Sequence, residues 1–332
     1  MDSSSSTVSP SDHVATLRSQ VEKALGSVVA NREPAVLYDP VEYVLEGGGK
    51  RVRPTLLLLV AEAYGRSPAA SLPAALAVEV FHNFTLVHDD IMDEAQERRG
   101  RPTVHEKWDV GTAILTGDLL MGLSYELLGD VPEVPDDALY EVYHPMVEKL
   151  CSGQALDASF EGQADVSVDA YLDMIDGKTA ALLSACFELG AVVGGSPPEH
   201  QTQLRTAGRL VGRAFQIQDD LLDLTADGEE WGKAVGGDLV TGKKTYLTLR
   251  ALERAEGSEY DWFARLIHDG GLPPGDVEEA RERMERLGVF DEARAEVARY
   301  SAEARTHLTV LPAGQARETL GWLIDEMEAR SH

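Results

Sequence analysis

Two short segments of the chain each place three aspartates within five positions, in the same order and spacing. The first is "DDIMD" (Asp89, Asp90, Asp93) and the second is "DDLLD" (Asp219, Asp220, Asp223). On a helix, residues four positions apart share a face, so the first and third aspartates of each segment project together. Carboxylate oxygens suit hard divalent cations such as Mg²⁺, which typically takes one or two carboxylates together with waters and phosphate oxygens. One such cluster is usually a solvated helix face, but two copies on apolar helices predict cation sites that receive an anionic ligand.

Basic residues are scarce in this chain, yet they gather beside the acidic segments. "EGGGKRVRPT" places Lys50, Arg51 and Arg53 after three glycines, which allow a sharp turn before a predicted helix. The other members of this set are Arg98, Arg99, Lys178, Lys233 and Lys243. Arginine is well suited to bidentate phosphate recognition, so the set predicts anchors for two diphosphate groups. The alternative for any single member is an ion pair with a nearby aspartate.

Neither lysine-containing glycine segment has the pattern of a nucleotide-binding Walker A loop. Arg51 follows Lys50, and Lys244 follows Lys243, where that motif requires Ser or Thr. No predicted strand precedes either segment. An NTPase is therefore not the favoured interpretation.

The charge balance of the chain is strongly acidic. Lys and Arg total 30 against 57 Asp and Glu, a formal net charge of −27 that is spread along all 332 residues. We interpret this as an acidic surface adapted to a high-salt cytoplasm, as in a halophilic archaeon, with an ordinary acidic protein as the alternative. Nucleic-acid binding is disfavoured, because no basic face is available to neutralise phosphates.

Apolar and cysteine content indicate a cytoplasmic protein. No apolar run reaches the length of a membrane span, and the opening "MDSSSSTVSP" lacks the apolar core of a signal peptide. Cys151 and Cys186 both occur in apolar helical settings, which predict reduced core thiols rather than a disulfide.

Helical periodicity dominates the chain, and no series of alternating strands is evident. The clearest helical patterns span residues 54–65, 71–95, 111–130, 168–195 and 200–227. Several of them are apolar on nearly all sides, which places them at the centre of a bundle. We therefore predict an all-α protein with a disordered tail over residues 1–12 and one domain over residues 13–332.

The combined motifs resemble the trans-isoprenyl diphosphate synthases, also called polyprenyl synthetases. The resemblance covers about residues 40–250 and lies in "GGGKRVRP", "LVHDDIMDEAQERRGRPTVH", "GKTAALL" and "FQIQDDLLD…GKAVGGD…GKKT". It implies an isoprenoid-synthase-type bundle of about ten or more helices around a deep central cavity, usually as a homodimer. It also implies that an allylic diphosphate is condensed with isopentenyl diphosphate, with release of diphosphate.

The resemblance assigns expected roles residue by residue. Two or three Mg²⁺ ions, with Mn²⁺ as an alternative, would be bound by Asp89, Asp93, Asp219 and Asp223, with Asp90 and Asp220 as supporting acids. Arg98, Lys178, Lys233 and Lys243 would hold the allylic diphosphate, and Lys50, Arg53, His82 and Arg99 would hold isopentenyl diphosphate. Thr179 and Gln216 would lie beside the developing carbocation and, with Lys178, form the catalytic set. His88 is expected to be structural.

Residues upstream of the first acidic segment set the expected product length. Phe84, Thr85 and Phe81 lie five, four and eight positions before Asp89, roughly 6–12 Å along a helix. In the family, an aromatic residue five positions before the motif limits growth, and aromatics at both five and four favour C15. Because Thr85 is small, the pattern resembles archaeal enzymes that make C20 geranylgeranyl diphosphate for membrane lipids. C15 farnesyl and C25 geranylfarnesyl diphosphate are the alternatives, and Phe81 and Phe84 are otherwise ordinary core aromatics.

Three other classes of protein share part of this pattern. A terpene cyclase or head-to-head synthase would have an acidic motif, but it would not need the second set of basic residues. A non-catalytic partner subunit would be expected to have lost a motif, whereas both are intact. A metal-buffering bundle would leave the basic set unexplained.

Overall fold

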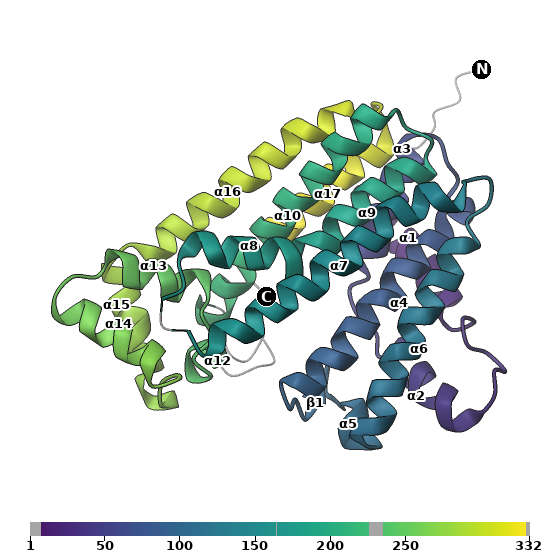
Figure 1. Cartoon of the computed structure of the whole chain (residues 1–332). Helices are drawn as coiled ribbons and strands as arrows, with labels where there is room; N and C mark the ends of the chain where they lie inside the picture. Colours follow the sequence, from purple (N-terminus) through teal and green to yellow (C-terminus); the bar gives the residue numbers. More distant parts are fainter. Residues whose placement is uncertain (1–7, 164, 226–234, 330–332) are drawn as a thin grey trace. The chain divides into compact units, whose positions relative to one another are not determined.

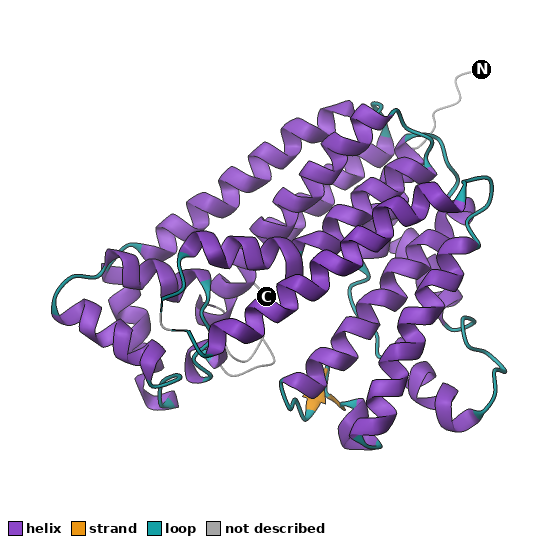
Figure 2. Ribbon diagram, in the orientation of Figure 1, coloured by secondary structure: helices purple, strands orange, loops and turns teal. Residues whose placement is uncertain are grey.

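The computed structural model describes residues 8–163, 165–225 and 235–329, and almost all regular structure within them is helical (Figure 2). This confirms the all-α class. The helices up to the second acidic segment are α1 (Pro10–Leu25), α2 (Ala35–Leu45), α3 (Val52–Ala63), α4 (Pro68–Met92), α5 (Val104–Lys107), α6 (Val110–Gly129), α7 (Asp136–Glu161), α8 (Val168–Lys178), α9 (Ala180–Val193) and α10 (Pro198–Thr225). They are followed by α12 (Gly237–Val240), α13 (Tyr246–Arg254), α14 (Ser258–His268), α15 (Val277–Arg286), α16 (Val289–His307) and α17 (Gln315–Glu328), with short 3-10 turns at Pro274–Asp276 and Leu308–Val310.

The contacts divide the chain into two compact units. Unit 1 comprises residues 1–143, 185–204 and 310–323, and unit 2 comprises residues 144–184, 205–309 and 324–332. The division falls within α7, α9, α10 and α17. Helix α1 of unit 1 begins at Pro10, where Ser9 Oγ accepts the Asp12 N–H at 3.1 Å. Residues 10–12 therefore form a capped helical turn, although the sequence assigned them to the tail.

Helices α3, α4 and α6 form the centre of unit 1, and α4 and α6 run side by side (Figure 1). Residues 56–60 of α3 are completely buried, as are Ala74, Ala75 and Ala77 of α4. Burying one such leucine or valine side chain contributes about 1.5–3 kcal/mol. Small residues allow close approach: a Cβ added to Gly190 of α9 would lie 2.7 Å from the Leu57 carbonyl oxygen of α3.

Helix α4 is long and apolar enough to cross a membrane by length and composition alone. Within the described part of the chain, α4 is the one helix that meets this criterion. Of its apolar window, 67% is buried inside the fold. That degree of burial is the pattern of a core helix. Its last turn carries the first acidic motif.

Unit 2 contains α8 and, from the C-terminal third, helices α12 to α16. Residues 168–195 do not form the single helix that the sequence predicts, because α8 ends at Lys178 and α9 starts at Ala180. The break is at Thr179, whose N–H bonds to the Ile175 carbonyl at 3.1 Å while its hydroxyl donates to Gln216 of α10 at 2.9 Å. A tertiary hydrogen bond at this position therefore accompanies the end of the helix.

The prediction of two core thiols is only half right. Cys186 of α9 is buried, and burial raises the pKa of its thiol to about 12. Cys151 of α7 is exposed, because its neighbours Leu150 and Gly153 occupy the buried stripe of that helix. Both cysteines are free thiols.

Two two-residue strands interrupt the helical pattern in unit 1. Strands β1 (Glu97–Arg98) and β2 (Arg101–Pro102) pair antiparallel, with Arg98 opposite Arg101. Arg99 and Gly100 form the turn with positive φ values of 54° and 69°. This hairpin follows α4 and fixes the direction of the arginines that come after the first acidic motif.

Candidate active site

The first acidic motif lies at the carboxyl end of α4. Asp93 is the C-cap residue, and its N–H bonds to the Asp89 carbonyl at 2.8 Å, so the helical turn is intact between them. Asp89 and Asp93 therefore share one face, as the spacing predicts. Asp93 is exposed and the Asp89 side chain is 24% exposed. Asp90 points the other way and is buried.

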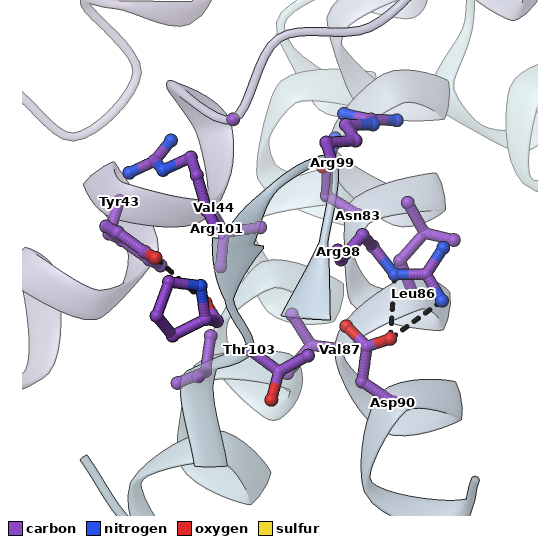
Figure 3. Close-up of a pocket in the computed structure, with 13 residues that line it drawn as sticks. Tyr43, Val44, Asn83, Leu86, Val87, Asp90, Arg98, Arg99, Arg101 and Thr103 are labelled. Carbon is purple, nitrogen blue, oxygen red and sulfur yellow. Dashed lines mark hydrogen bonds and ion pairs between the residues drawn. The ribbon is translucent and has the colours of Figure 1, made fainter. Parts of the chain in front are cut away.

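The hairpin brings Arg98 onto the buried aspartate. Arg98 Nε and Nη2 each lie 2.7 Å from Asp90 Oδ1 (Figure 3). Nη2 also lies 3.8 Å from Asp89 Oδ2. Burial raises the pKa of Asp90, although Arg98 opposes the shift. Arg98 is still 36% exposed at its side chain, so it can hold Asp90 and present the rest of its guanidinium outward.

A small recess lies beside this pair. It has a volume of about 50 Å³, and its lining comes from α2, α4, the hairpin and the start of α5. Figure 3 shows Arg98 turned toward Asp90, while Arg101 lies beside Tyr43, over whose ring its guanidinium carbon stacks at 3.9 Å. The two sides of the hairpin therefore carry cations with different partners, an anion on one side and an aromatic ring on the other.

A second basic cluster forms where α3 begins. Arg53 Nη1 lies 3.2 Å from His82 Nε2 of α4. Burial and the neighbouring arginines lower the pKa of His82 well below its ordinary value, so the ring is neutral at pH 7 and its Nε2 accepts from Arg53. Burial also lowers the pKa of Arg53. The structure therefore brings together two residues that the family resemblance assigns to the same substrate.

Arg99 joins this cluster through the glycine loop at residues 47–49. Its Nη1 donates to the Gly48 carbonyl, and a Cβ added to Gly49 would lie 3.0 Å from the Arg99 guanidinium. Gly49 has a φ of 135°, so glycine is needed both for conformation and for space. Lys50 follows directly and is exposed. The three glycines thus serve a close approach of backbone to arginine.

The second acidic motif lies on α10 in unit 2 and repeats the arrangement of the first. Asp219 is exposed and Asp223 is half-buried, whereas Asp220 is buried. Asp223 Oδ2 accepts the Asp238 N–H at 3.2 Å. In both motifs the first and third aspartates lie toward solvent and the middle one is held inside the protein.

Asp220 is held by three donors. Its carboxylate accepts from the Tyr171 hydroxyl at 2.6 Å, from the Tyr246 N–H at 2.9 Å and from Gln216 Nε2 at 3.0 Å. Burial raises the pKa of Asp220 to about 7, against the effect of these donors. Gln216 Oε1 in turn accepts from Thr179, so the predicted polar pair of the reaction site is anchored on the buried acid.

The predicted lysines of unit 2 have different surroundings. Lys178 Nζ donates to Asp157 of α7 at 2.5 Å. Lys243 is exposed, while its neighbour Lys244 is buried. Lys233 lies outside the described residues. Asp157 and Tyr171 were not predicted from the sequence, since each is defined by a partner distant along the chain.

The aspartates offer the donor chemistry that Mg²⁺ requires. Each motif presents two carboxylates on one helical face, and the middle carboxylate is already engaged. Over the described ranges, no group of three or more His, Cys, Asp or Glu side chains is arranged to hold a metal ion. Two carboxylates per site match the usual protein contribution to a Mg²⁺ whose other ligands are waters and phosphate oxygens.

An all-α fold with two Asp-Asp-x-x-Asp helices, each accompanied by arginines or lysines, defines the class of the isoprenoid diphosphate-using synthases. Within this class the chain belongs to the polyprenyl synthetase family, whose model matches residues 34–284. It is accordingly a trans-prenyltransferase.

Relatives of known name span nearly the whole chain. A geranylfarnesyl diphosphate synthase of Natronomonas pharaonis is 39% identical over 97% of this chain and 99% of its own length. The solved geranylgeranyl pyrophosphate synthetase of Pyrococcus horikoshii is 36% identical, with a TM-score of 0.90 over 96% of this chain and 99% of that one. A polyprenyl synthase of Caulobacter crescentus, solved with calcium and isoprenyl diphosphate, is 29% identical, with a TM-score of 0.87 over 98% and 99% of the two chains.

Proposed function

We propose that the chain condenses isopentenyl diphosphate with dimethylallyl, geranyl and farnesyl diphosphates to give all-trans geranylgeranyl diphosphate (C20). The observation that carries this proposal is the matched geometry of the two acidic motifs, each with two outward carboxylates and one anchored carboxylate. Two of the relatives described above are named for C20 and C25 products, which supports a product in this range.

In the proposed reaction, Asp89, Asp93, Asp219 and Asp223 would hold the divalent cations. Mg²⁺, when bound, neutralises charge on the departing diphosphate and so favours ionisation of the allylic C–O bond. The family resemblance assigns Arg98, Lys178, Lys233 and Lys243 to the same diphosphate, to which they would contribute positive charge. Asp90 and Asp220 orient Arg98 and Gln216, respectively, by the hydrogen bonds described above.

The second substrate is assigned to the cluster at the start of α3. Lys50, Arg53 and Arg99 supply the positive charge for isopentenyl diphosphate, and neutral His82 can donate only through Nδ1, since Nε2 accepts from Arg53. We assign Thr179 and Gln216, which are hydrogen-bonded to each other at 2.9 Å, to the stabilisation of the allylic carbocation through their oxygen atoms. The double bond then attacks that cation, and a proton is lost to the released diphosphate.

Product length is assigned to the aromatic residues of α4. The Phe81 and Phe84 ring centroids lie 5.2 Å apart, and Phe81 also lies 5.6 Å from Tyr143. Phe81 is fully buried and Phe84 is 9% exposed, while Thr85 is half-buried and small. We assign the limit on growth to Phe84, with a C15 or a C25 product as the alternatives.

The remaining parts of the proposal concern the protein in the cell. We propose a homodimer in the cytoplasm of a halophilic archaeon, using Mg²⁺ and supplying precursors for membrane lipids. The net charge of −27 supports the salt-adapted setting. Activity of the purified enzyme that is independent of salt, or highest at low salt, would contradict that part.

The test is a product assay. The protein is incubated in high salt with Mg²⁺, isopentenyl diphosphate and each of the C5, C10 and C15 allylic diphosphates, and the dephosphorylated products are sized by chromatography. Consumption of isopentenyl diphosphate with accumulation at C20 is expected. Cyclisation of the starter without that consumption would indicate a terpene cyclase, and no turnover with any starter would indicate a partner subunit.

A further inference from the structure

A fully buried ion pair lies behind the second basic cluster. Arg51 Nη1 and Glu79 Oε1 are 2.6 Å apart, and the two side chains are only 3% and 4% exposed. Removing two charges from water is costly and is compensated only by good geometry and further hydrogen bonds. A pair of this kind is therefore weak evidence for stability, and its placement suggests another role.

The pair fixes an unusual backbone conformation. Arg51 is the N-cap of α3 and has φ 46° and ψ 39°, in the left-handed region that non-glycine residues rarely adopt. Its Nη2 donates to the Leu45 carbonyl at the end of α2 at 3.0 Å, and its own carbonyl accepts from Thr55 Oγ1 at 2.7 Å. Residue 51 is thus held from both its side chain and its main chain.

The residues beside Arg51 belong to the proposed isopentenyl diphosphate site. Lys50 precedes it, and Arg53 follows and contacts His82 at 3.2 Å. Glu79 and His82 are three positions apart on α4, so they lie on one face of that helix. Two contacts therefore link the start of α3 to the same face of α4, one through Arg51 and Glu79 and one through Arg53 and His82.

Glu79 is also the anion that acts on this group of arginines. The pKa values of Arg53 and Arg99 are lowered by burial, and Glu79 opposes the shift in both. The charge of Arg51 itself contributes to the lowering for Arg99. Pairing Arg51 with Glu79 reduces this repulsion and keeps Arg51 away from solvent.

We propose that Arg51 and Glu79 are positioning residues for the second diphosphate. They do not touch the substrate; they hold the loop at residues 47–53 so that Lys50 and Arg53 face it. This inference rests on the proposed function, because it concerns the isopentenyl diphosphate site of that reaction. A pair with only a structural role would affect both substrates alike.

The experiment compares steady-state kinetics of the whole protein with Glu79→Gln, which keeps the shape and removes the charge. The KM for isopentenyl diphosphate is expected to rise about tenfold or more, while kcat and the KM for the allylic substrate stay within about twofold. Glu79→Asp keeps the charge and should recover part of the loss. Glu126→Gln is the matched control, because Glu126 pairs with Arg32 at 2.8 Å on an exposed surface and should change neither KM.

A second variant covers the case in which Glu79→Gln does not fold. Thr55→Val removes the hydroxyl that holds the Arg51 carbonyl and preserves the side-chain shape, so it should raise the same KM to a smaller degree. Two results would overturn this inference and leave the proposed function intact. One is an equal rise in KM for both substrates. The other is an unchanged KM for isopentenyl diphosphate in a folded variant, when the wild-type protein is active. Absence of isopentenyl diphosphate consumption by the wild-type protein would overturn the proposed function and this inference with it.

Discussion

Adjacent aspartates in the two motifs have opposite surroundings although they are identical in type. Asp89 lies toward solvent, whereas Asp90 is buried against Arg98. In the second motif Asp219 is exposed, whereas Asp220 accepts three hydrogen bonds. A carboxylate already engaged by protein donors has less capacity for a cation than an outward one. The role of each residue therefore follows from its direction on the helix.

Replacement of an outward aspartate should abolish metal-dependent turnover. We expect Asp89→Ala and Asp219→Ala each to lower kcat by at least about 100-fold, since each removes charge that offsets the departing diphosphate. Activity is measured against Mg²⁺ concentration, with chelator added as the zero point. Asp130→Ala, at the exposed end of α6, is the control and should retain activity. Near-normal turnover in Asp89→Ala or Asp219→Ala would contradict the cation assignment.

Replacement of Phe84 should lengthen the product. The Phe84 ring contacts Phe81 in a tilted arrangement and His88 edge to face, at centroid distances of 5.2 Å and 4.9 Å. Phe84→Ala removes this ring, so chains beyond C20 should accumulate with the C15 starter, as sized by chromatography. Phe263→Ala in α14 creates a comparable cavity in unit 2 and should reduce stability by about 3–5 kcal/mol without changing product length. The same products from Phe84→Ala and wild type would show that Phe84 does not limit growth.

Neutral His82 should make folding stability depend on pH. Its folded-state pKa is lowered well below 6.5, so between that value and 6.5 the unfolded chain takes up a proton that the folded chain does not. The corresponding stability is fully present above pH 6.5 and is lost as the pH falls below it. Urea unfolding at several pH values from 7.5 to 5 should therefore show a smaller acid loss in His82→Gln than in wild type. His144→Gln, at a 63% exposed side chain, should retain the wild-type loss; an equal loss in all three proteins would rule out this role.

At the scale of elements, the contact of α4 with α6 depends on one glycine. A Cβ added to Gly117 of α6 would lie 2.2 Å from His88 Nε2, a distance that requires His88 or the helix to move. Gly117→Ala should destabilise the protein by about 1–3 kcal/mol through overpacking. Gly122→Ala is the matched control on the same helix, where a Cβ meets nothing within 4 Å, and it should be neutral or stabilising by up to about 1 kcal/mol. Thermal unfolding that ranks the two variants equally would contradict the close contact.

Local patterns were sufficient to predict the main helices. The segment 54–65 corresponds to α3 (Val52–Ala63), and 111–130 corresponds to α6 (Val110–Gly129), because apolar periodicity and flanking glycines report directly on these elements. The outward pairing of Asp89 with Asp93 also followed from helix geometry alone. Elements set by their own sequence were thus accessible.

Features set by distant partners were not accessible in the same way. The break at Thr179 coincides with a bond to Gln216, 37 positions later, and Asp220 is held by Tyr171, 49 positions earlier. The partner of Arg51 is 28 positions away on α4. No local pattern encodes such pairs, so the sequence assigned Arg51 only to a phosphate-binding loop and passed over Glu79.

At the scale of the whole molecule, acidic charge exceeds what pairing can neutralise. Even if each of the 30 Lys and Arg residues paired with a carboxylate, 27 of the 57 acids would have no basic partner of this kind. The helices of unit 2 use many of the available arginines in local pairs, such as Arg283 with Glu279 and Arg299 with Glu296. The remaining acids repel one another in the folded protein, and only dissolved cations can screen them.

Stability should therefore rise with salt. Screening shortens the range of charge repulsion from about 10 Å at 0.1 M to about 3 Å at 1 M, so the melting temperature should increase steeply up to about 1 M KCl and slowly thereafter. Sucrose at matched osmolality separates screening from general solute effects. A variant in which the exposed acids Asp173, Glu282, Glu285 and Glu326 are replaced by the corresponding amides carries less charge and should melt higher at low salt and respond less to KCl. A melting temperature independent of KCl, or an identical salt response in both proteins, would show that the acidic surface is not what limits folding at low salt.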